Sequence, residues 1–574
     1  MVRVAIRFSK MLKKKGFIFL IFIILVGLVP LLDLFNSGLP LTHDGKDHVA
    51  RIANFYQSLV EGNIIPRWGA NLNWGFGHPV MMFLYPFSSY AASLFHFLGF
   101  TLIDSLKIVF GVSFVVSGIG MYLWVNKLFG NYSGVLAAVL YMFAPYRFVN
   151  LYVRGAIGEH VSFTFIPFIL FFITRIFFNK KKSLRSILPD LICVSVFTAF
   201  LILSHNALSI LFLVFAAFYT LVLFYSIREV RKLIFIFISV IYGFLLSAFF
   251  WLPAYIEGKY TLRDIVTGGF EYADRFVISP VEFIMPSWSY GITGQLSVQI
   301  GILHISLIII SLFVVFKLSK KEKLTKSLFI LTFAFFLLSL FMMLKQSDFI
   351  WSSISTIQKF QFPWRFLSLT VLTSAFLGAF CFAVIKKENK KIVGIAIVLL
   401  LTAFFYASYW RANDYLLKSD GFFKSVYHGT TDTGESSPIW SIRFMEKEAS
   451  GPIEVISGSA LIQEKYRSTT SHVYTVDVQQ RARIKENTLY FPGWNIYVND
   501  KKLDVNSEIE FQDPQNRGVM TFWLDPGKYN VRVEFEETRL RTVSAAASIL
   551  SLISLALLTI YMVVVKKTNE KNNS

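Results

Sequence analysis

The sequence is poor in charged residues and almost free of cysteine. Asp, Glu, Lys and Arg together make up 16% of its 574 residues, whereas hydrophobic residues make up 55%. Several apolar runs reach about 20 residues, the length that crosses a bilayer, and this excludes a soluble globular protein. The two cysteines, Cys193 and Cys381, lie within apolar runs, so no disulfide framework is expected even for an exported domain.

Several common catalytic signatures are also missing. The sequence contains no Walker loop, no HExxH, no GxSxG and no CxxC pair. These absences exclude the usual motifs of nucleotide binding, zinc-dependent hydrolysis, serine esterase chemistry and thiol exchange. Any chemistry of this chain must therefore come from residues outside those motifs.

Basic residues outnumber acidic ones and give a net charge of +20. In a soluble protein this excess would suggest a nucleic-acid partner. Here Lys and Arg gather in short clusters between apolar runs, which is the pattern of cytoplasmic loops in membrane proteins. We therefore expect a multi-pass plasma membrane protein that binds no nucleic acid. The clusters that define its cytoplasmic side are Arg3–Lys15, Lys180–Arg185, Arg228–Lys232, Lys317–Lys326 and Lys386–Lys391.

The apolar runs predict a polytopic α-helical protein with about 12 transmembrane helices. The first run, at roughly 16–35, is long and lacks a cleavage site, so we expect an anchor rather than a signal peptide. With both termini cytoplasmic the number of crossings is even, which makes the run at 79–98 a re-entrant or interfacial part of the first outer loop. The other spans are expected at roughly 107–125, 133–150, 161–178, 187–204, 207–226, 232–252, 298–317, 327–344, 364–385, 391–410 and 543–565.

Composition divides the chain into three parts. Residues 1–410 form the transmembrane domain, with a large first outer loop at 36–106, and residues 542–574 form the last helix and a cytoplasmic tail. Between them, residues 411–541 contain alternating stretches such as MTFWLD and the turn signals Pro-Gly and Asp-Pro-Gly. This pattern predicts an extracytoplasmic, β-sandwich-like domain before the last helix.

The first outer loop holds many ionisable side chains directly beside a span. Asp44 can serve as the N-cap of a short amphipathic helix at 47–61 that would lie on the membrane surface. Asp44 and Asp47, with His43 and His48 beside them, can supply a general base or ligate a divalent cation such as Mg²⁺ or Mn²⁺. The alternatives are a capping role for Asp44 and a solvated helix surface for Asp47 and His48.

Other predicted outer loops add a second acid and more arginines. Glu159 is either a functional carboxylate or the ion-pair partner of Arg154. Arg51, Arg154 and Arg365 are candidates to hold phosphate, because a guanidinium group matches phosphate oxygens with two hydrogen bonds. Arg365 could instead extend its side chain toward the membrane interface. Arg67, in the first loop, is grouped with the substrate-binding candidates.

The order of these motifs resembles the GT-C superfamily of membrane glycosyltransferases. The stretch LTHDGKDHVARIANFYQSLVEGNIIPRW at 41–68 is similar to the first loop of the oligosaccharyltransferase catalytic subunit. The stretch SGVLAAVLYMFAPYRFVNLYVRGAIGEH at 133–160 is similar to its third span and second outer loop. In that comparison Asp44 falls on the first catalytic acid, Arg154 on the loop arginine, and Glu159 on or beside the second acid. The WWD-type motif of oligosaccharyltransferases is missing, so glycosylation of peptide sequons is not implied.

The chain is more similar still to bacterial membrane proteins described as YfhO-like or 6-pyruvoyl-tetrahydropterin synthase-related. This similarity extends over nearly the whole chain. The motifs that carry it are HDG at 43–45, RW at 67–68, RGAIGE at 154–159, QFPWRF at 361–366 and YFPGWNIYVND at 490–500.

The GT-C resemblance implies transfer of a sugar from a polyprenyl-phosphate-linked donor in the membrane lipid to an envelope polysaccharide, teichoic acid or glycolipid on the outer face. Asp44 would act as the base or position the acceptor hydroxyl, and Glu159 would support a cation or the acceptor. Arg365 and Arg154 would hold the donor phosphate. Two alternatives stay open, a transporter of lipid-linked sugars and a non-catalytic envelope-assembly protein. The remaining substrate-binding candidates are Asp47, His48, Arg51 and Arg67.

Overall fold

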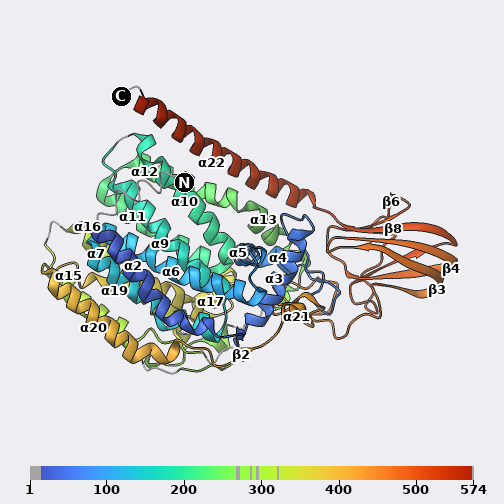
Figure 1. The fold of residues 1–574 in the computed structure, drawn as a ribbon, viewed down its shortest axis with the longest axis horizontal. Coiled ribbons are helices and arrows are strands. Elements are labelled where there is room, and N and C mark those ends of the chain that lie inside the picture. Colours follow the sequence, from blue (N-terminus) through green and yellow to red (C-terminus); the bar gives the residue numbers. More distant parts are fainter. Residues whose placement is uncertain are drawn as a thin grey trace.

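The computed structural model describes residues 14–181, 183–266, 272–284, 288–291, 296–319 and 322–571. Most of the N-terminal basic cluster and part of the predicted outer loop at 253–299 lie outside these residues. In the described part, apolar helices form a bundle, and an antiparallel sheet stands at one end of it (Figure 1). The chain is thus a polytopic helical membrane protein with a separate β-rich unit near its C-terminus.

Among the described residues, eight helices are long and apolar enough to cross a membrane, or up to ten if each of two bent pairs is one span. About 12 were predicted. The runs at 298–317 and 364–385 contain only α15 (Ile302–Phe316) and α19 (Leu367–Phe380), each about 21–22 Å long at 1.5 Å per residue. An apolar run does not show where a helix begins. Here α15 begins only after Gly301, and α19 begins only after the 3₁₀ turn at Pro363–Phe366. The eight long spans are residues 16–35, which include most of α2 (Lys14–Leu28), and α6 (Leu102–Phe129), α9 (Ile157–Phe178), α10 (Leu184–Ser204), α11 (Asn206–Ile227), α16 (Lys323–Met343), α20 (Glu388–Tyr406) and α22 (Arg539–Lys571).

The bent pairs interrupt two of the predicted spans. The first pair is α7 (Asn131–Met142) and the segment 145–153, bent by 48°, and the second is α12 (Val230–Leu246) and the segment 248–260, bent by 70°. A break at membrane depth leaves backbone groups that a neighbour must satisfy. Ser548 of α22 does so at the second break, where its hydroxyl donates to Leu245 O and accepts from Phe249 N, both at 2.9 Å.

The run at 79–98 consists of α4 (Val80–Phe83) and α5 (Phe87–Phe97). At 11 residues, α5 is too short to cross, as expected for part of a loop. The predicted helix of the first loop is α3 (Gly45–Val60), and ten of its sixteen residues are buried. It is therefore enclosed by protein on both faces, instead of lying on a membrane surface, because a distant segment covers its polar face.

The sheet contains six antiparallel strands in the order β3-β4-β8-β5-β6, with β7 also paired to β4. The long strand β4 pairs with β8 along its first half and with β7 along its second half, so one apolar core lies against both. That core continues into the first loop, where Trp68 meets Trp494 at 5.4 Å between ring centroids. The strands are β3 (Ile453–Arg467), β4 (Ser471–Leu489), β5 (Trp494–Val498), β6 (Lys501–Lys502), β7 (Val519–Leu524) and β8 (Gly527–Phe535).

Residues 412–445, here called the strap, do not join this sheet although they belong to the predicted β-rich domain. The strap begins with β2 (Tyr415–Leu416), which pairs with β1 (Leu39–Pro40), and continues through α21 (Asp420–Lys424). It then runs along the first loop, where Trp74 N donates to Tyr427 O at 3.0 Å. It is the strap that covers the polar face of α3.

Candidate active site

The first loop is joined directly to the segment that precedes α9. Asp44 N donates to Arg154 O at 2.8 Å, and His43 N donates to Val153 O at 3.0 Å. The approach requires glycine at position 155, where φ is +68° and a Cβ atom would come within 2.3 Å of Thr42 Oγ1. The two loops that the sequence predicts to carry the acids are therefore in contact.

The RGAIGE motif has a physical explanation in this geometry. A π-helical turn at Val149–Val153 leads into Arg154, and such turns are frequent at functional sites. Four residues on, a Cβ atom at Gly158 would lie 2.1 Å from Tyr85 Cε2, so only glycine admits the Tyr85 ring here. The motif thus combines two charged side chains with the two glycines that let the first loop pack against them.

Asp44 occupies the N-cap position of α3, but its side chain makes no capping hydrogen bond. Thr42 Oγ1 accepts from Gly45 N instead, at 3.1 Å. Burial raises the pKa of Asp44, nearby Arg154 opposes that rise, and Asp47 adds to it. No capping hydrogen bond occupies the Asp44 carboxylate, so it can accept a proton from a substrate. Its raised pKa makes it a stronger base than an exposed aspartate.

Glu159 is the centre of a buried charge cluster, with a side chain that is 1% exposed. Its Oε1 lies 3.0 Å from Arg154 Nη1, 3.4 Å from Arg365 Nε and 3.9 Å from His205 Nε2. The Tyr146 hydroxyl donates to Oε2 at 2.8 Å. Glu159 is thus both the ion-pair partner of Arg154 and the organiser of nitrogen donors from three separate segments.

Three residues of this site are absent from the sequence-based candidates, namely Tyr85, Tyr146 and His205. Tyr85 stacks on His205 with ring centroids 5.0 Å apart, and burial raises the pKa of its hydroxyl. Their positions gave little signal, since His205 directly follows the apolar run at 187–204, whereas Tyr146 lies within the run at 133–150 and Tyr85 within that at 79–98. Position alone did not connect them to Glu159.

Asp47 and Arg51 face the strap, and His48 lies beside Arg51. Asp47 Oδ1 accepts from the Tyr427 hydroxyl at 2.6 Å. Arg51 donates from Nε to Thr431 Oγ1 at 3.3 Å and from a second nitrogen to Thr431 O, and its Nη1 lies 3.1 Å from His48 Nδ1. These predicted substrate-binding residues therefore hold the strap on α3 in this structure.

Arg67 lies in a different place, at the junction of the bundle and the sheet. Its Nε pairs with Glu537 at 3.0 Å, and its Nη1 donates to Phe249 O at 3.0 Å. Pro253, four residues later in α13 (Ala248–Glu257), has no N–H for that carbonyl. Arg67 thus satisfies a backbone group that the proline leaves free.

Replacing Arg67 by Met should destabilise the protein without weakening donor binding. The change leaves the partly buried Phe249 carbonyl without its Arg67 donor, at a cost of up to about 1–3 kcal/mol. Thermal unfolding and limited proteolysis of the purified protein measure this. Glu537→Gln is the matched control, because it removes the half-exposed ion pair but keeps the carbonyl bond, and it should change little. Equal effects of the two variants would contradict the role given to the carbonyl.

A divalent cation does not fit the Glu159 cluster. Two guanidinium groups lie within 3.4 Å of the carboxylate and would repel the metal. In the described part of the chain, no group of three or more His, Cys, Asp or Glu side chains is arranged to hold a metal ion. The Asp44 and Glu159 side chains, which the sequence allows as Mg²⁺ or Mn²⁺ ligands, thus have different surroundings, and those of Glu159 suit an anion.

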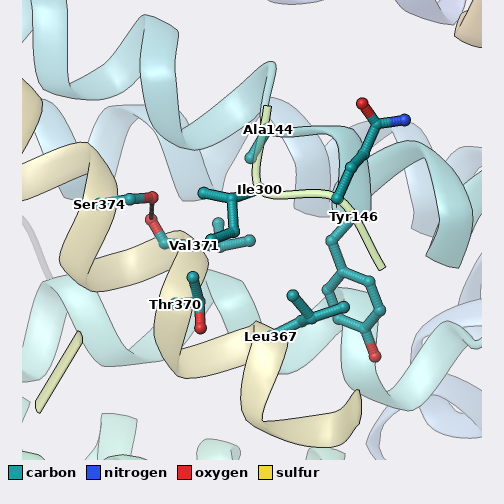
Figure 2. A pocket seen from close by; sticks show the side chains of 8 residues that line it. Ala144, Tyr146, Ile300, Leu367, Thr370, Val371 and Ser374 are labelled. Carbon is teal, nitrogen blue, oxygen red and sulfur yellow. Dashed lines mark hydrogen bonds between the residues drawn. The ribbon is translucent and has the colours of Figure 1, made fainter. Parts of the chain in front are cut away.

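Tyr146 also lines a small pocket on the α19 side of the cluster, which has almost no room for even one water molecule. Figure 2 shows Leu367, Thr370, Val371 and Ser374 of α19 on one side of it, with Tyr146 opposite. Substrate pockets usually hold about 300–1,000 Å³. This pocket is too small for a sugar-phosphate lipid, and the site is better defined by its charged side chains.

The chain is similar to several known proteins. It matches the family model of the 6-pyruvoyl-tetrahydropterin synthase related domain, a membrane protein family, over residues 82–413, more than half of its length. An uncharacterised protein of Lactococcus lactis subsp. cremoris is 26% identical over 250 residues, which are 42% of this chain and 40% of that protein. The chain thus spans well under half the length of that relative.

Partial backbone similarity extends to three solved membrane transferases. For the arabinofuranosyltransferase AftD from Mycobacteria the TM-score is 0.44 at 14% identity, over 70% of this chain and 27% of that one. For the Archaeoglobus fulgidus oligosaccharyltransferase it is 0.43 at 12% identity, over 73% and 60%. For ArnT from Cupriavidus metallidurans it is 0.39 at 12% identity, over 71% and 67%. The match of residues 82–413 places this chain in the 6-pyruvoyl-tetrahydropterin synthase-related family of membrane proteins.

Proposed function

We propose that this chain is a membrane glycosyltransferase of the GT-C type that moves a sugar from a polyprenyl-phosphate-linked donor to a cell-envelope acceptor on the outer face of the membrane. The observation that carries the proposal is the pairing of a half-buried carboxylate, free of side-chain hydrogen bonds among the described residues, with a cationic cluster. Asp44 has no hydrogen bond to its side chain among the described residues, and its backbone is bonded to Arg154, which pairs with Glu159. The sequence resemblance to GT-C enzymes supports the same assignment.

The reaction follows from these positions. The oxygen of an acceptor hydroxyl attacks the anomeric carbon, the bond from that carbon to the phosphate oxygen breaks, and its electron pair leaves with the phosphate. The hydroxyl proton passes to the Asp44 carboxylate, which acts as general base. Arg365, with Arg154 behind it, stabilises the charge that develops on the leaving phosphate.

The acceptor is proposed to approach from the end of the bundle that carries the sheet. Segments predicted to share the outer face contact one another there, since Leu262 N donates to Ser437 O and the Tyr290 hydroxyl donates to Arg411 O, both at 2.8 Å. The sheet stands on the same end (Figure 1). An envelope polysaccharide, a teichoic acid or a glycolipid headgroup could reach Asp44 from this side, with both termini in the cytoplasm.

The test is sugar transfer by the purified protein in proteoliposomes that contain polyprenyl-phosphate-linked hexoses with a labelled sugar. We expect release of free polyprenyl phosphate, a readout that does not require the acceptor to be known beforehand, together with label in an added envelope fraction. A transporter would move the lipid-linked sugar across the bilayer with the sugar–phosphate bond intact. An envelope-assembly protein without catalytic activity would do neither, and either result would refute the proposal.

Transfer should fall on the acid side of its pH profile as Asp44 takes up a proton. The base works only as the carboxylate, and burial raises its pKa above the ordinary 3.8 despite the opposing charge of Arg154. The loss should therefore begin at higher pH than for an exposed aspartate. Release of polyprenyl phosphate measured through the acid range checks this, with donor binding over the same range as the control. A rate that holds down to the ordinary aspartate pKa would contradict the role of Asp44 as base.

A further inference from the structure

Three nitrogen donors lie near Glu159 Oε1, but only one of these atoms, Arg154 Nη1, is hydrogen-bonded to other protein groups. Arg154 Nη1 pairs with Glu159 at 3.0 Å and also donates to Asn150 Oδ1 at 2.9 Å and to the Tyr146 hydroxyl at 3.2 Å. The Arg365 guanidinium is anchored through Nη1, which donates to Phe360 O at 2.6 Å and to Gln361 Oε1 at 3.3 Å. Its Nε lies 3.4 Å from Oε1 without hydrogen-bond geometry and has no hydrogen-bond partner among the described residues. His205 Nε2 lies 3.9 Å away, which is beyond hydrogen-bond reach. Two buried donors are therefore available to a ligand.

The other ring nitrogen of His205 fixes which way its proton points. His205 is the N-cap of α11, and its Nδ1 accepts from Leu208 N at 3.2 Å. An accepting nitrogen carries a lone pair, so the proton of the neutral ring is on Nε2. Burial lowers the pKa of His205 to about 3, despite the opposing charge of Glu159. The ring is thus a neutral N–H donor that faces the cluster, and Tyr85 is stacked on one side of it.

We propose that Arg365 and His205 together bind the phosphate of the polyprenyl-linked donor, while Arg154 and Tyr146 hold Glu159 behind them. This inference rests on the proposed function and adds a phosphate-binding histidine that the sequence did not indicate. Arg154 and Arg365 carry two positive charges and Glu159 one negative charge, so these three side chains have a net charge of +1, which matches a phosphodiester monoanion. The Asp44 carboxylate, also near Arg154, is the group that takes the acceptor proton. His205 gives a hydrogen bond and no proton, and the bond strengthens as the leaving phosphate becomes a dianion.

His205→Asn separates this role from helix capping. Asn is among the best N-cap residues, so Leu208 N keeps an acceptor, but the shorter side chain cannot place a donor at the Nε2 position. In nanodiscs we expect an unchanged unfolding temperature and about 10- to 100-fold weaker binding of undecaprenyl phosphate, the factor for one hydrogen bond to a charged group. In the transfer assay KM for the lipid donor should rise accordingly. His205→Ser also caps a helix and provides a second variant if His205→Asn is unstable.

The outcomes distinguish the two proposals. Wild-type protein that binds undecaprenyl phosphate but transfers no sugar, with binding weakened in His205→Asn, would refute the transferase assignment and support the phosphate site. Unchanged binding by a stable His205→Asn, or no binding by the wild type, would overturn the phosphate site. Inorganic phosphate is the second probe. If it bound as tightly as the lipid and with the same loss in the variant, the site would be one for free phosphate and the lipid assignment would fail.

Discussion

Replacing Asp44 by Asn is expected to reduce the rate of sugar transfer by about 10²- to 10⁴-fold, the range that general-base catalysis contributes. Asn has the same shape and also suits an N-cap position. The bond from the backbone N–H of residue 44 to Arg154 O is kept, so the two loops stay joined. Only the ability to accept a proton is lost. Release of polyprenyl phosphate at saturating donor measures the effect.

The control for this variant is Asp47→Asn. Asp47 is three residues away on the same helix, but its carboxylate accepts from Tyr427 of the strap. Its replacement should leave turnover within a few-fold of wild type. Full turnover by Asp44→Asn, with an unfolding temperature equal to that of the wild type, would show that the base is another residue.

Replacing Glu159 by Gln is expected to destabilise the protein by about 3–5 kcal/mol, the cost of removing one partner from a buried ion pair. The cause is not the lost attraction alone. Arg154 and Arg365, whose side chains are 9% and 13% exposed, would be left as buried cations without a counter-charge. Thermal unfolding in nanodiscs measures the loss, and transfer should fall in the same variant because its donors are no longer held.

A double variant separates the charge balance from the function. Glu159→Gln with Arg154→Met restores the number of positive charges minus negative ones to its original value, and much of the stability should return. Transfer should not return, because the double variant lacks both the Arg154 guanidinium and the carboxylate beside Arg365 Nε. If Glu159→Gln alone unfolded at the wild-type temperature, Glu159 could not be the counter-charge of the cluster.

The sequence predicted the parts of this protein that depend on local pattern. Apolar length located most of the helices and alternation located the strands, whereas the cytoplasmic side assigned from the charge clusters stays a prediction. Asp44, Arg154 and Glu159 were selected together because the two loops that carry them resemble the first and second outer loops of GT-C enzymes. Their contact follows from two glycines, one of which is Gly155, that lie in the same motif as Arg154 and Glu159.

The rest depends on contacts between distant residues, which pattern does not contain. His205 reaches Glu159 only because α9 and α11 begin side by side at the same end of the bundle. The strap was assigned to the β-rich domain since its composition is polar, yet it pairs with the first loop. An apolar run likewise does not reveal the breaks in the two bent pairs or the short lengths of α15 and α19.

The strap has a consequence for the order in which the chain is made. The partners of Asp47 and Arg51 are Tyr427 and Thr431, each 380 residues further along the chain. Translation proceeds from the N-terminus, and earlier segments fold first. The polar face of α3 therefore stays uncovered until most of the bundle has been synthesised. The site can bind substrate only after the strap, which follows α20, has been synthesised. A nascent or truncated chain that lacks the strap therefore cannot have a complete site.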